Sequence, residues 1–318
     1  MANPDNKIQV SIIIPVKNGI KGGIGKCLSG IFAQKTSLTY EVIAIDSGST
    51  DGTLDVLKSY PQITLIQIRP EEFGHGKTRN LGAQKARGDA LVFINQDAWP
   101  ANDKWLDALV GALYSDDRVA GVYGRQMPKP DAFLYVKKDL LGAFGVSRKI
   151  KGSSDMDEAR AHLDLLRRRM RDVIFFSTVS AAVKKSVWEK MPFKDDIPFA
   201  EDQEWAKRVI QAGYKIVYEP GSSVFHSHNF SFRELFKFKD PSVELFNVLL
   251  ERRWAGPFLA LPYFAWNVLA RPFADIRYIL HEKGDSGYKA SQIYIAVISR
   301  FLITTSRTFA LLSQPFTK

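Results

Sequence analysis

The chain of 318 residues contains a single cysteine, Cys27. One thiol excludes an intramolecular disulfide and any metal site built from several cysteines. Such sparse use of cysteine is typical of proteins in a reducing compartment, so we expect a cytoplasmic protein. A free cysteine is most often buried, and core packing is the role we expect for Cys27.

Long hydrophobic runs are also missing. A membrane-spanning helix needs about 20 apolar residues. The longest candidate, residues 254–270, is interrupted by Pro257, Pro262 and Asn267. No secretory signal is recognisable, because the first seven residues are polar and the apolar stretch after them is broken by Pro15. We therefore expect a protein that is soluble or bound at a membrane surface.

Acidic charge is scarce relative to basic charge. The chain has 44 Lys and Arg against 34 Asp and Glu, a formal net charge of +10. This balance favours anionic partners, such as nucleic acid, phosphorylated metabolites or acidic lipid head groups. A basic nucleic-acid-binding α/β protein, with residues 167–171 (RRRMR) as its contact, is a distant alternative. It lacks an RNA-binding signature and interleaved aromatic and basic residues, so we expect no nucleic-acid partner.

Short apolar runs alternate with helical segments along the first hundred residues. We expect strands at 8–16, 40–45, 63–68 and 90–94, with helices at 25–34, 53–60 and 77–87 between them. This alternation predicts an α/β fold with a largely parallel sheet and right-handed crossovers.

The rest of the chain is less regular. We expect further segments in the order strand 119–123, insertion 131–172 with a basic helix at its end, ordered residues 175–183, helix 202–212 and strand 215–218. From residue 231 the pattern becomes helical, and 12 Lys and Arg against 7 Asp and Glu place +5 of the net charge there. The expected domains are residues 1–230 and 231–318.

The apolar run Ala90–Ile94 leads directly into Asn95, Gln96 and Asp97. Ligands of parallel sheets bind just beyond the carboxyl ends of the strands, so Asp97 is expected at a ligand pocket. The alternative is that Asp97 caps a helix that begins near Trp99.

Asp46 ends the second expected strand, and the turn SGSTDGT follows it. Hydroxyl and backbone amide donors in such a turn suit an anion or a nucleotide ring. A capped helix is the alternative, but it needs only Thr50 or Asp51 and leaves Asp46 unexplained.

The segment FGHGKTRN places His75 between two glycines, with Lys77 and Arg79 at the start of a helix. Glycines allow close approach of the backbone to a ligand, and cations oppose the helix dipole there. This arrangement favours a bound phosphate, although a solvated loop histidine is the plainer interpretation of His75.

Two later segments supply further candidates. Glu201 and Asp202 begin a helix, where one acid can act as general base while the other supports it; a negatively charged first turn is the plainer alternative. His226 and His228 are two residues apart, so on an extended strand they would share a face and reach a metal or a diphosphate.

In this order the motifs resemble family-2 glycosyltransferases of the GT-A fold, and their pattern looks like that of bacterial rhamnosyltransferases that use dTDP-rhamnose. The motifs are PVKN from Pro15, DSGSTDGT from Asp46, FGHGKTRNLGA, INQDAWP, YGRQMP and FAEDQEWAKRVIQAGYKIVYEP. The resemblance covers about residues 8–230. It implies a mainly parallel, Rossmann-like mixed sheet with flanking helices and a C-terminal helical extension.

The resemblance also implies roles for individual residues. Asp202 matches the general base, with Glu201 as its neighbour. The metal-binding Asp-x-Asp becomes Asn95-Gln96-Asp97, so Asp97 is the expected ligand of Mg2+ or Mn2+, with His226 and His228 available to complete the shell. Donor-binding roles fall to Pro15, Asp46, His75, Lys77, Arg79, Asn95, Gln96 and Asp97. Arg125 and Gln126, after the 119–123 strand, are candidates to contact donor or acceptor.

The activity implied is inverting transfer of a deoxyhexose, L-rhamnose from dTDP-β-L-rhamnose, onto a sugar hydroxyl. The acceptor would be a bacterial surface polysaccharide, such as O-antigen or capsule, or its lipid-linked precursor. A UDP-hexose-dependent enzyme of the same family is the alternative.

The C-terminal region suggests where the protein acts. Residues 288–313 fit a helix with Lys289, Arg300 and Arg307 on one side, which can lie on an anionic membrane. Trp254, Tyr263, Phe264 and Trp266 add rings suited to the lipid interface. This predicts a peripheral protein on the inner face of the cell membrane. The alternative is that this helix packs on the catalytic domain or in a homodimer.

Overall fold

The computed structural model describes residues 7–161, 168–237 and 264–312. The chain forms two compact units. The first comprises residues 1–126, 145–164 and 168–226, and the second comprises residues 127–144, 165–167 and 227–318. The division therefore falls after residue 226, four residues before the expected boundary, and the expected insertion 131–172 is shared between both units.

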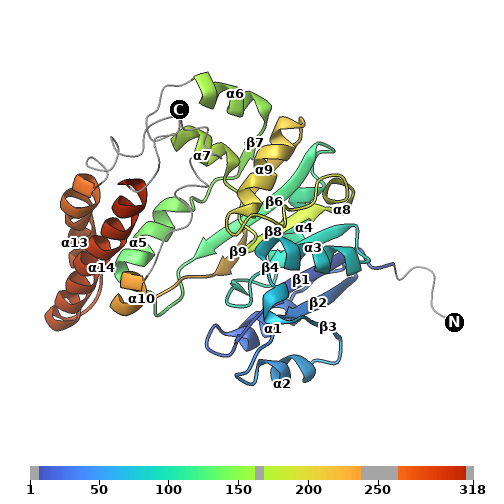
Figure 1. Cartoon of the computed structure of the whole chain (residues 1–318), viewed down its shortest axis with the longest axis horizontal. Coiled ribbons are helices and arrows are strands. Elements are labelled where there is room, and N and C mark those ends of the chain that lie inside the picture. Colours follow the sequence, from blue (N-terminus) through green and yellow to red (C-terminus); the bar gives the residue numbers. More distant parts are fainter. Residues whose placement is uncertain (1–6, 162–167, 238–263, 313–318) are drawn as a thin grey trace. The chain divides into compact units, whose positions relative to one another are not determined.

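The first unit contains a sheet whose parallel part comes from the first hundred residues (Figure 1). Its strands are β1 (Val10–Val16), β2 (Tyr40–Asp46), β3 (Ile63–Gln67) and β4 (Ala90–Ile94), in the order β3-β2-β1-β4. The connections are α1 (Ile24–Phe32), α2 (Thr53–Lys58), the short 3-10 helix η1 (Pro70–Glu72) and α3 (His75–Lys85). The expected β-α-β alternation is confirmed, because strands buried on both faces carry continuous apolar runs.

Beyond β4 the strands of the sheet pair antiparallel wherever their register is defined. The order continues β4-β8-β6-β9-β5, and β7 pairs with β9. These strands are β5 (Trp99–Pro100), β6 (Val119–Met127), β7 (Lys149–Lys151), β8 (Ser180–Lys184) and β9 (Lys215–Phe225). The helices here are α4 (Trp105–Leu113), α6 (Ser153–Ala161), α7 (Arg168–Ile174), α8 (Lys185–Trp188) and α9 (Glu201–Gln211). The sheet is thus mixed: β1–β4 pair in parallel, and the pairs β4–β8, β6–β8, β5–β9 and β7–β9 are antiparallel.

Several expected boundaries are wrong. Trp99 pairs with Phe225 in a two-residue strand, so no helix begins there and Asp97 caps none. β9 continues to Phe225 through Pro220 and Gly221, residues that normally end a strand. β6 continues to Met127, which places Arg125 and Gln126 within the strand rather than after it. Within residues 175–183, which were expected to be ordered, the strand β8 begins at Ser180.

Alternate side chains of β1 point to two separate hydrophobic layers. Ile12 and Ile14 belong to a cluster with residues of α1 and α4, and buried Cys27 packs there as expected. Ile13 faces the other side, where α3 approaches: a Cβ added to Gly82 would lie 2.5 Å from Ile13 Cγ2 and 3.0 Å from Ile45 Cδ1. Gly82 therefore sets how closely α3 packs on the sheet.

The second unit is helical in the part that the structure describes. It contains α5 (Leu134–Ala143), α10 (Phe232–Lys237), the π-helical η2 (Trp266–Ala270), α13 (Arg271–His281) and α14 (Ser286–Leu312). Helices α5, α13 and α14 lie side by side (Figure 1). Their small apolar core contains Leu134, Tyr135, Ile279 and Ala296.

An ionic cluster is buried in this unit. The Arg300 side chain is 6% exposed and bonds Asp275 Oδ2 through Nε at 2.8 Å and Asp139 Oδ2 at 2.7 Å. Lys138 Nζ lies 2.6 Å from Asp275 Oδ1. The expected cationic face of residues 288–313 is therefore wrong for Arg300, whose charge faces Asp139 and Asp275 inside the unit. Lys289 donates to the Leu280 carbonyl at 2.8 Å.

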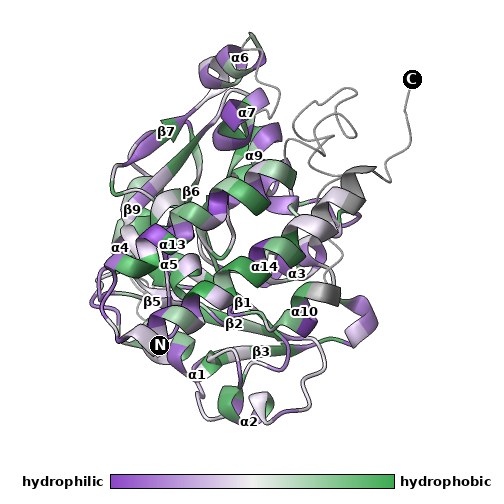
Figure 2. Ribbon diagram, turned by 90° about the vertical axis from the view of Figure 1, so that its left-hand side faces the viewer, coloured by the Kyte–Doolittle hydropathy of each residue, from purple (hydrophilic) through white to green (hydrophobic). Residues whose placement is uncertain are grey.

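Of the remaining expectations for the chain's second half, several fall outside the described residues: Trp254, Tyr263 and the Arg307 side chain. The basic helix is present in its described part as α7, whose hydrophilic residues stand out in Figure 2. Among the described residues, no helix is both long enough and apolar enough to cross a membrane.

The close approach of α3 yields a prediction about stability. Gly82→Ala adds a methyl group that overlaps Ile13, and overpacking of a core costs about 1–3 kcal/mol. The matched control is Gly111→Ala in α4, where the added Cβ meets nothing within 4 Å. There alanine is expected to stabilise the helix by up to about 1 kcal/mol. Urea unfolding of both variants measures the difference, and equal effects would contradict this packing.

Candidate active site

Polar residues gather where the parallel strands end. Asp46 is the last residue of β2, and Asn95, Gln96 and Asp97 follow β4 directly. Because β1, β2 and β4 are parallel, these ends meet at one edge of the sheet, together with the loop after β1. Pro15 lies within β1, opposite Ile45 of β2.

Backbone and side-chain hydrogen bonds fix the loops at this edge. Gln96 accepts from Lys17 N at 2.9 Å and donates to Lys17 O at 2.8 Å. Asn18, whose φ of 47° is unusual for a residue other than glycine, accepts from Thr50 N at 2.8 Å, and its own N–H donates to Ser49 Oγ at 2.9 Å. Gln96 thus orders the loop through the backbone of Lys17.

The Asp46 carboxylate is fully buried and shapes its own turn. Its Oδ2 accepts from the N–H groups of Gly48 and Ser49 at 3.1 Å each, and Oδ1 accepts from Ser49 Oγ. These bonds explain Asp46 without a ligand. Contrary to expectation, the capped turn therefore accounts for Asp46 as well.

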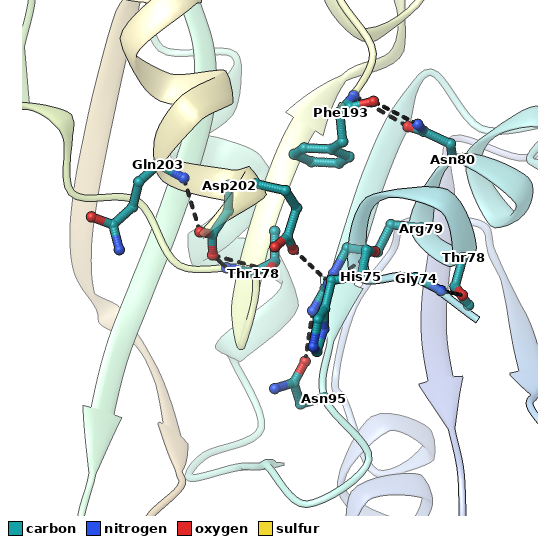
Figure 3. A network of polar contacts seen from close by, with 11 residues as sticks. Gly74, His75, Thr78, Arg79, Asn80, Asn95, Thr178, Phe193, Asp202 and Gln203 are labelled. Carbon is teal, nitrogen blue, oxygen red and sulfur yellow. Dashed lines mark hydrogen bonds and ion pairs between the residues drawn. The ribbon is translucent and has the colours of Figure 1, made fainter. Parts of the chain in front are cut away.

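Helix α3 begins at His75, and its first turns place three candidate residues differently. His75 and Lys77 are exposed, whereas Arg79 is 5% exposed. The Arg79 guanidinium donates to Glu201 Oε1 at 2.7 Å, to the His75 carbonyl at 3.1 Å and to Asn95 Oδ1 at 3.1 Å (Figure 3). The charge of Arg79 is therefore matched inside the protein by Glu201, and Lys77 is the cation of this segment that faces solvent.

Glu201 and Asp202 begin α9 and have different partners. Ala200 before them adopts the left-handed conformation with φ 60°, a strained geometry for alanine. Glu201 pairs with Arg79, and both side chains are 5% exposed. Asp202 Oδ2 accepts from Thr178 N at 3.0 Å and Thr178 Oγ1 at 3.2 Å, while Oδ1 accepts from Gln203 N at 2.8 Å.

The environment of Asp202 changes its acidity. Burial, followed by the negative charge of Glu201, raises the pKa of Asp202 from 3.8 to about 6. The hydrogen bond from Thr178 and the charge of Arg79 act in the opposite direction. A carboxyl group with a pKa near 6 is ionised at neutral pH and remains a stronger base than an ordinary aspartate, which suits proton abstraction.

Asp97 lies beside His226, which follows β9. The distance from His226 Nε2 to Asp97 Oδ2 is 3.6 Å, and both side chains are largely buried. Gln126 Nε2 donates to Ser177 Oγ at 3.0 Å, so its Oε1 accepts from His226 Nδ1 at 2.9 Å. This bond orients the imidazole so that its Nε2 atom lies on the side of Asp97.

The sequence did not identify Thr178 and Ser177, or the contact between Gln126 and His226. These residues meet because β6, β8 and β9 lie side by side in the sheet, and no local motif shows this. His226 and His228 were expected on a strand, but β9 ends at Phe225, so both residues lie beyond the strand. His228 belongs to the second unit. Arg125 is half-buried on β6.

Solved structures define the class of the fold. The mannosyltransferase PcManGT from Pyrobaculum calidifontis, in complex with GDP-Man and Mn2+, has a TM-score of 0.55 at 19% identity; the match covers 98% of this chain and 87% of that one. Staphylococcus aureus TarS 1–349 in complex with UDP-GlcNAc has a TM-score of 0.51 at 16% identity, covering 90% and 70%. The fold is GT-A, as expected.

Sequence comparisons define the family. Residues 11–191 match the family described as Glycosyl transferase family 2. The O-antigen chain rhamnosyltransferase WbaN of Salmonella anatum is 36% identical over 208 residues, 65% of this chain and 62% of that protein. RfbN of Salmonella typhimurium, also an O-antigen chain rhamnosyltransferase, is 32% identical over 232 residues, 72% and 70% respectively. The chain belongs to glycosyl transferase family 2, near these rhamnosyltransferases. The match to WbaN spans less than two thirds of that relative's length.

The acidity of Asp202 predicts a pH-dependent effect on stability. Its pKa is raised on folding, so its contribution to stability is complete below about pH 4 and is lost as the pH rises through about 6. Asparagine does not titrate. The Tm of Asp202→Asn relative to the unmodified protein should therefore increase between these two pH values. Thermal unfolding at a series of pH values measures this difference, and a constant difference would contradict the raised pKa.

Proposed function

We propose that this protein is an inverting glycosyltransferase that moves L-rhamnose from dTDP-β-L-rhamnose onto a hydroxyl group of a sugar. The proposed acceptor is a bacterial surface polysaccharide of the O-antigen or capsule kind, or its lipid-linked precursor. The observation that carries the proposal is the separation of roles at the sheet edge: Asp97 with His226 forms one acidic centre, and Asp202 on Thr178 forms another. The names of the WbaN and RfbN relatives support rhamnose as the sugar.

Asp202 is the proposed general base. Its carboxylate takes the proton of the acceptor hydroxyl as the oxygen attacks the anomeric carbon of the donor, and the bond to the nucleotide diphosphate breaks in the same displacement. Attack from the opposite face inverts the anomeric centre, so no covalent enzyme intermediate is needed. Glu201 is held by Arg79 and supports Asp202 rather than taking the proton itself.

Asp97 and His226 are the proposed ligands of Mg2+ or Mn2+. Two ligands that bind one ion at about 2.1 Å each lie no more than about 4.2 Å apart, so the 3.6 Å between Asp97 Oδ2 and His226 Nε2 fits a shared ion. His228 follows two residues later and is proposed as a third ligand. When bound, the ion neutralises charge on the leaving diphosphate. Gln126 contacts His226 Nδ1 and so places the Nε2 atom on the side of Asp97, where the ion would bind.

The donor site is proposed along the loops at the same edge. Lys77 is an exposed cation in the first turn of α3 and can meet the diphosphate together with His75. Asp46 contributes through the turn that it orders, where the nucleotide base would lie. The further proposed donor contacts are Pro15, Asn95 and Gln96, with Arg125 and Gln126 facing donor or acceptor. A UDP-hexose donor is the alternative within the same family.

The test compares donors and then removes the base. Ligand stabilisation grows with the ratio of ligand concentration to Kd, so dTDP-rhamnose with Mn2+ should raise Tm more than UDP-glucose does. Asp202→Asn should lose about 100-fold or more in turnover while its donor-induced rise in Tm is kept. Greater stabilisation by UDP-glucose would favour the alternative donor, and near-normal turnover of Asp202→Asn would remove it from the role of base.

The second unit supports a proposed location at the inner face of the cell membrane. Trp266, Leu269, Phe273 and Leu280 follow one another at helical spacing along η2 and α13, and they are 60%, 64%, 75% and 53% exposed. Arg277 is exposed in the same stretch. Exposed apolar rings beside cations suit an anionic lipid interface. A second copy of the chain is the alternative partner for this face.

Sedimentation with vesicles checks this location. The full chain should sediment with vesicles that contain anionic lipid, and Phe273→Ser should weaken that binding about tenfold, since loss of one buried ring costs over 1 kcal/mol. Val146→Ser is the control, because Val146 is 74% exposed but belongs to the first unit. Absence of vesicle binding, with a dimer that Phe273→Ser dissociates, would instead assign the face to a homodimer.

A further inference from the structure

Arg79 joins three parts of the chain that are far apart in sequence. Its guanidinium contacts the start of its own helix at His75, the start of α9 at Glu201 and the segment after β4 at Asn95 (Figure 3). The side chain is 5% exposed, and its Nε atom has no hydrogen-bond partner among the described residues. Arg79 is therefore a buried cation whose strong contacts are internal.

Asn95 and Asp97 occupy the two ends of the motif Asn-x-Asp but serve different partners. The Asn95 side-chain oxygen accepts from Arg79 at 3.1 Å, whereas Asp97 lies beside His226. The backbone of Asn95 is also fixed, because its N–H donates to the Val179 carbonyl at 3.1 Å, next to Thr178. The side-chain oxygen of Asn95 is thus bonded to Arg79, and the residue shares a backbone contact with the segment that holds Asp202.

The charge balance explains why an amide suits this position. One guanidinium here faces two carboxyl groups, Glu201 in direct contact and Asp202 next to it in sequence. A carboxylate at position 95 would be a second anion within about 3 Å of the same guanidinium and would compete with Glu201 for it. The neutral amide of Asn95 satisfies the N–H group of Arg79 without that competition.

We propose that Arg79, Glu201 and Asn95 act together as positioning residues for Asp202, and that the amide of Asn95 keeps Arg79 on Glu201 rather than taking part in metal binding. The inference rests on the proposed function of Asp202. In this arrangement Glu201 orients the first turn of α9, and Thr178 fixes the Asp202 carboxylate. Arg79 holds α3, α9 and the end of β4 together.

The charged groups that face Asp202 determine the sign of each expected change. Glu201, on its own helix, raises the pKa of Asp202, and Arg79 of α3 lowers it. His75 of α3 also interacts electrostatically with Asp202. Partial burial and the charge of Arg79 lower the pKa of the His75 imidazole, and the charge of Asp202 acts in the opposite direction. The acid limb is the fall in activity at low pH, where Asp202 becomes protonated. Removing the charge of Glu201 should therefore shift this acid limb to lower pH. Drawing Arg79 towards position 95 should shift it to higher pH.

The experiment uses two isosteric variants of the full chain, Asn95→Asp and Glu201→Gln, with saturating donor and Mn2+. The dependence of kcat/KM on pH is measured from about pH 5 to about pH 9. We expect the acid limb to move up by about one pH unit in Asn95→Asp and down by about one in Glu201→Gln. The Mn2+ concentration needed for half-maximal activity should not fall in Asn95→Asp. Glu204→Gln is the control, because Glu204 pairs with Arg208 in the same helix and its loss should leave the limb in place.

Two results would overturn the inference. The first is an acid limb that stays in place in both variants. The second is a lower Mn2+ requirement in Asn95→Asp with an unshifted acid limb, which would make position 95 part of the metal site. A wild-type protein that transfers no sugar would refute the proposed function instead. In that case carboxyl NMR titration of Asp202 in the same variants reports the opposite shifts without turnover, and their absence would refute the positioning role as well.

Discussion

The ion pair between Arg79 and Glu201 joins two residues that are 122 positions apart and equally buried. Loss of one partner from a buried pair leaves an uncompensated charge and costs about 3–5 kcal/mol, so the pair strongly constrains how α3 and α9 meet. Asn95 adds the end of β4 to the same contact. The strained backbone of Ala200 is tolerated at the start of α9 because these contacts hold the residues that follow it.

The parallel half of the fold was predictable from the sequence, whereas in the antiparallel half only the first residues of β6 and β9 were expected as strands. Strands β1, β2 and β4 are buried on both faces, so each is a short apolar run that local pattern identifies, and β3 at the sheet edge is only partly buried. β5 has only two residues, and β9 contains Pro220 and Gly221, so both exist because of pairing with distant strands. The residue types in β5 and β9 do not show which distant strands they pair with.

For the site, the sequence motifs predicted the positions of the candidate residues more accurately than the contacts that these residues make. Asp97 and Asp202 were expected at the sheet edge or a helix start, and the structure places them there. Asp46, Arg79 and Gln96 were expected at the donor because of their chemistry, yet their hydrogen bonds are to the protein itself. A polar side chain that orders a loop and one that binds a ligand look the same in a sequence.

Helix α5 belongs to the second unit but is encoded between two segments of the first. The chain leaves the first unit after Gln126, forms α5 in the second unit, and returns at Gly145. Lys138 and Asp139 of α5 depend on Asp275 and Arg300, which are encoded more than a hundred residues later. No single cut separates the two units, because a protein shortened after His226 would keep α5 and lose the charges that neutralise it. Recombination that exchanges the C-terminal region for another must therefore exchange the α5 segment with it.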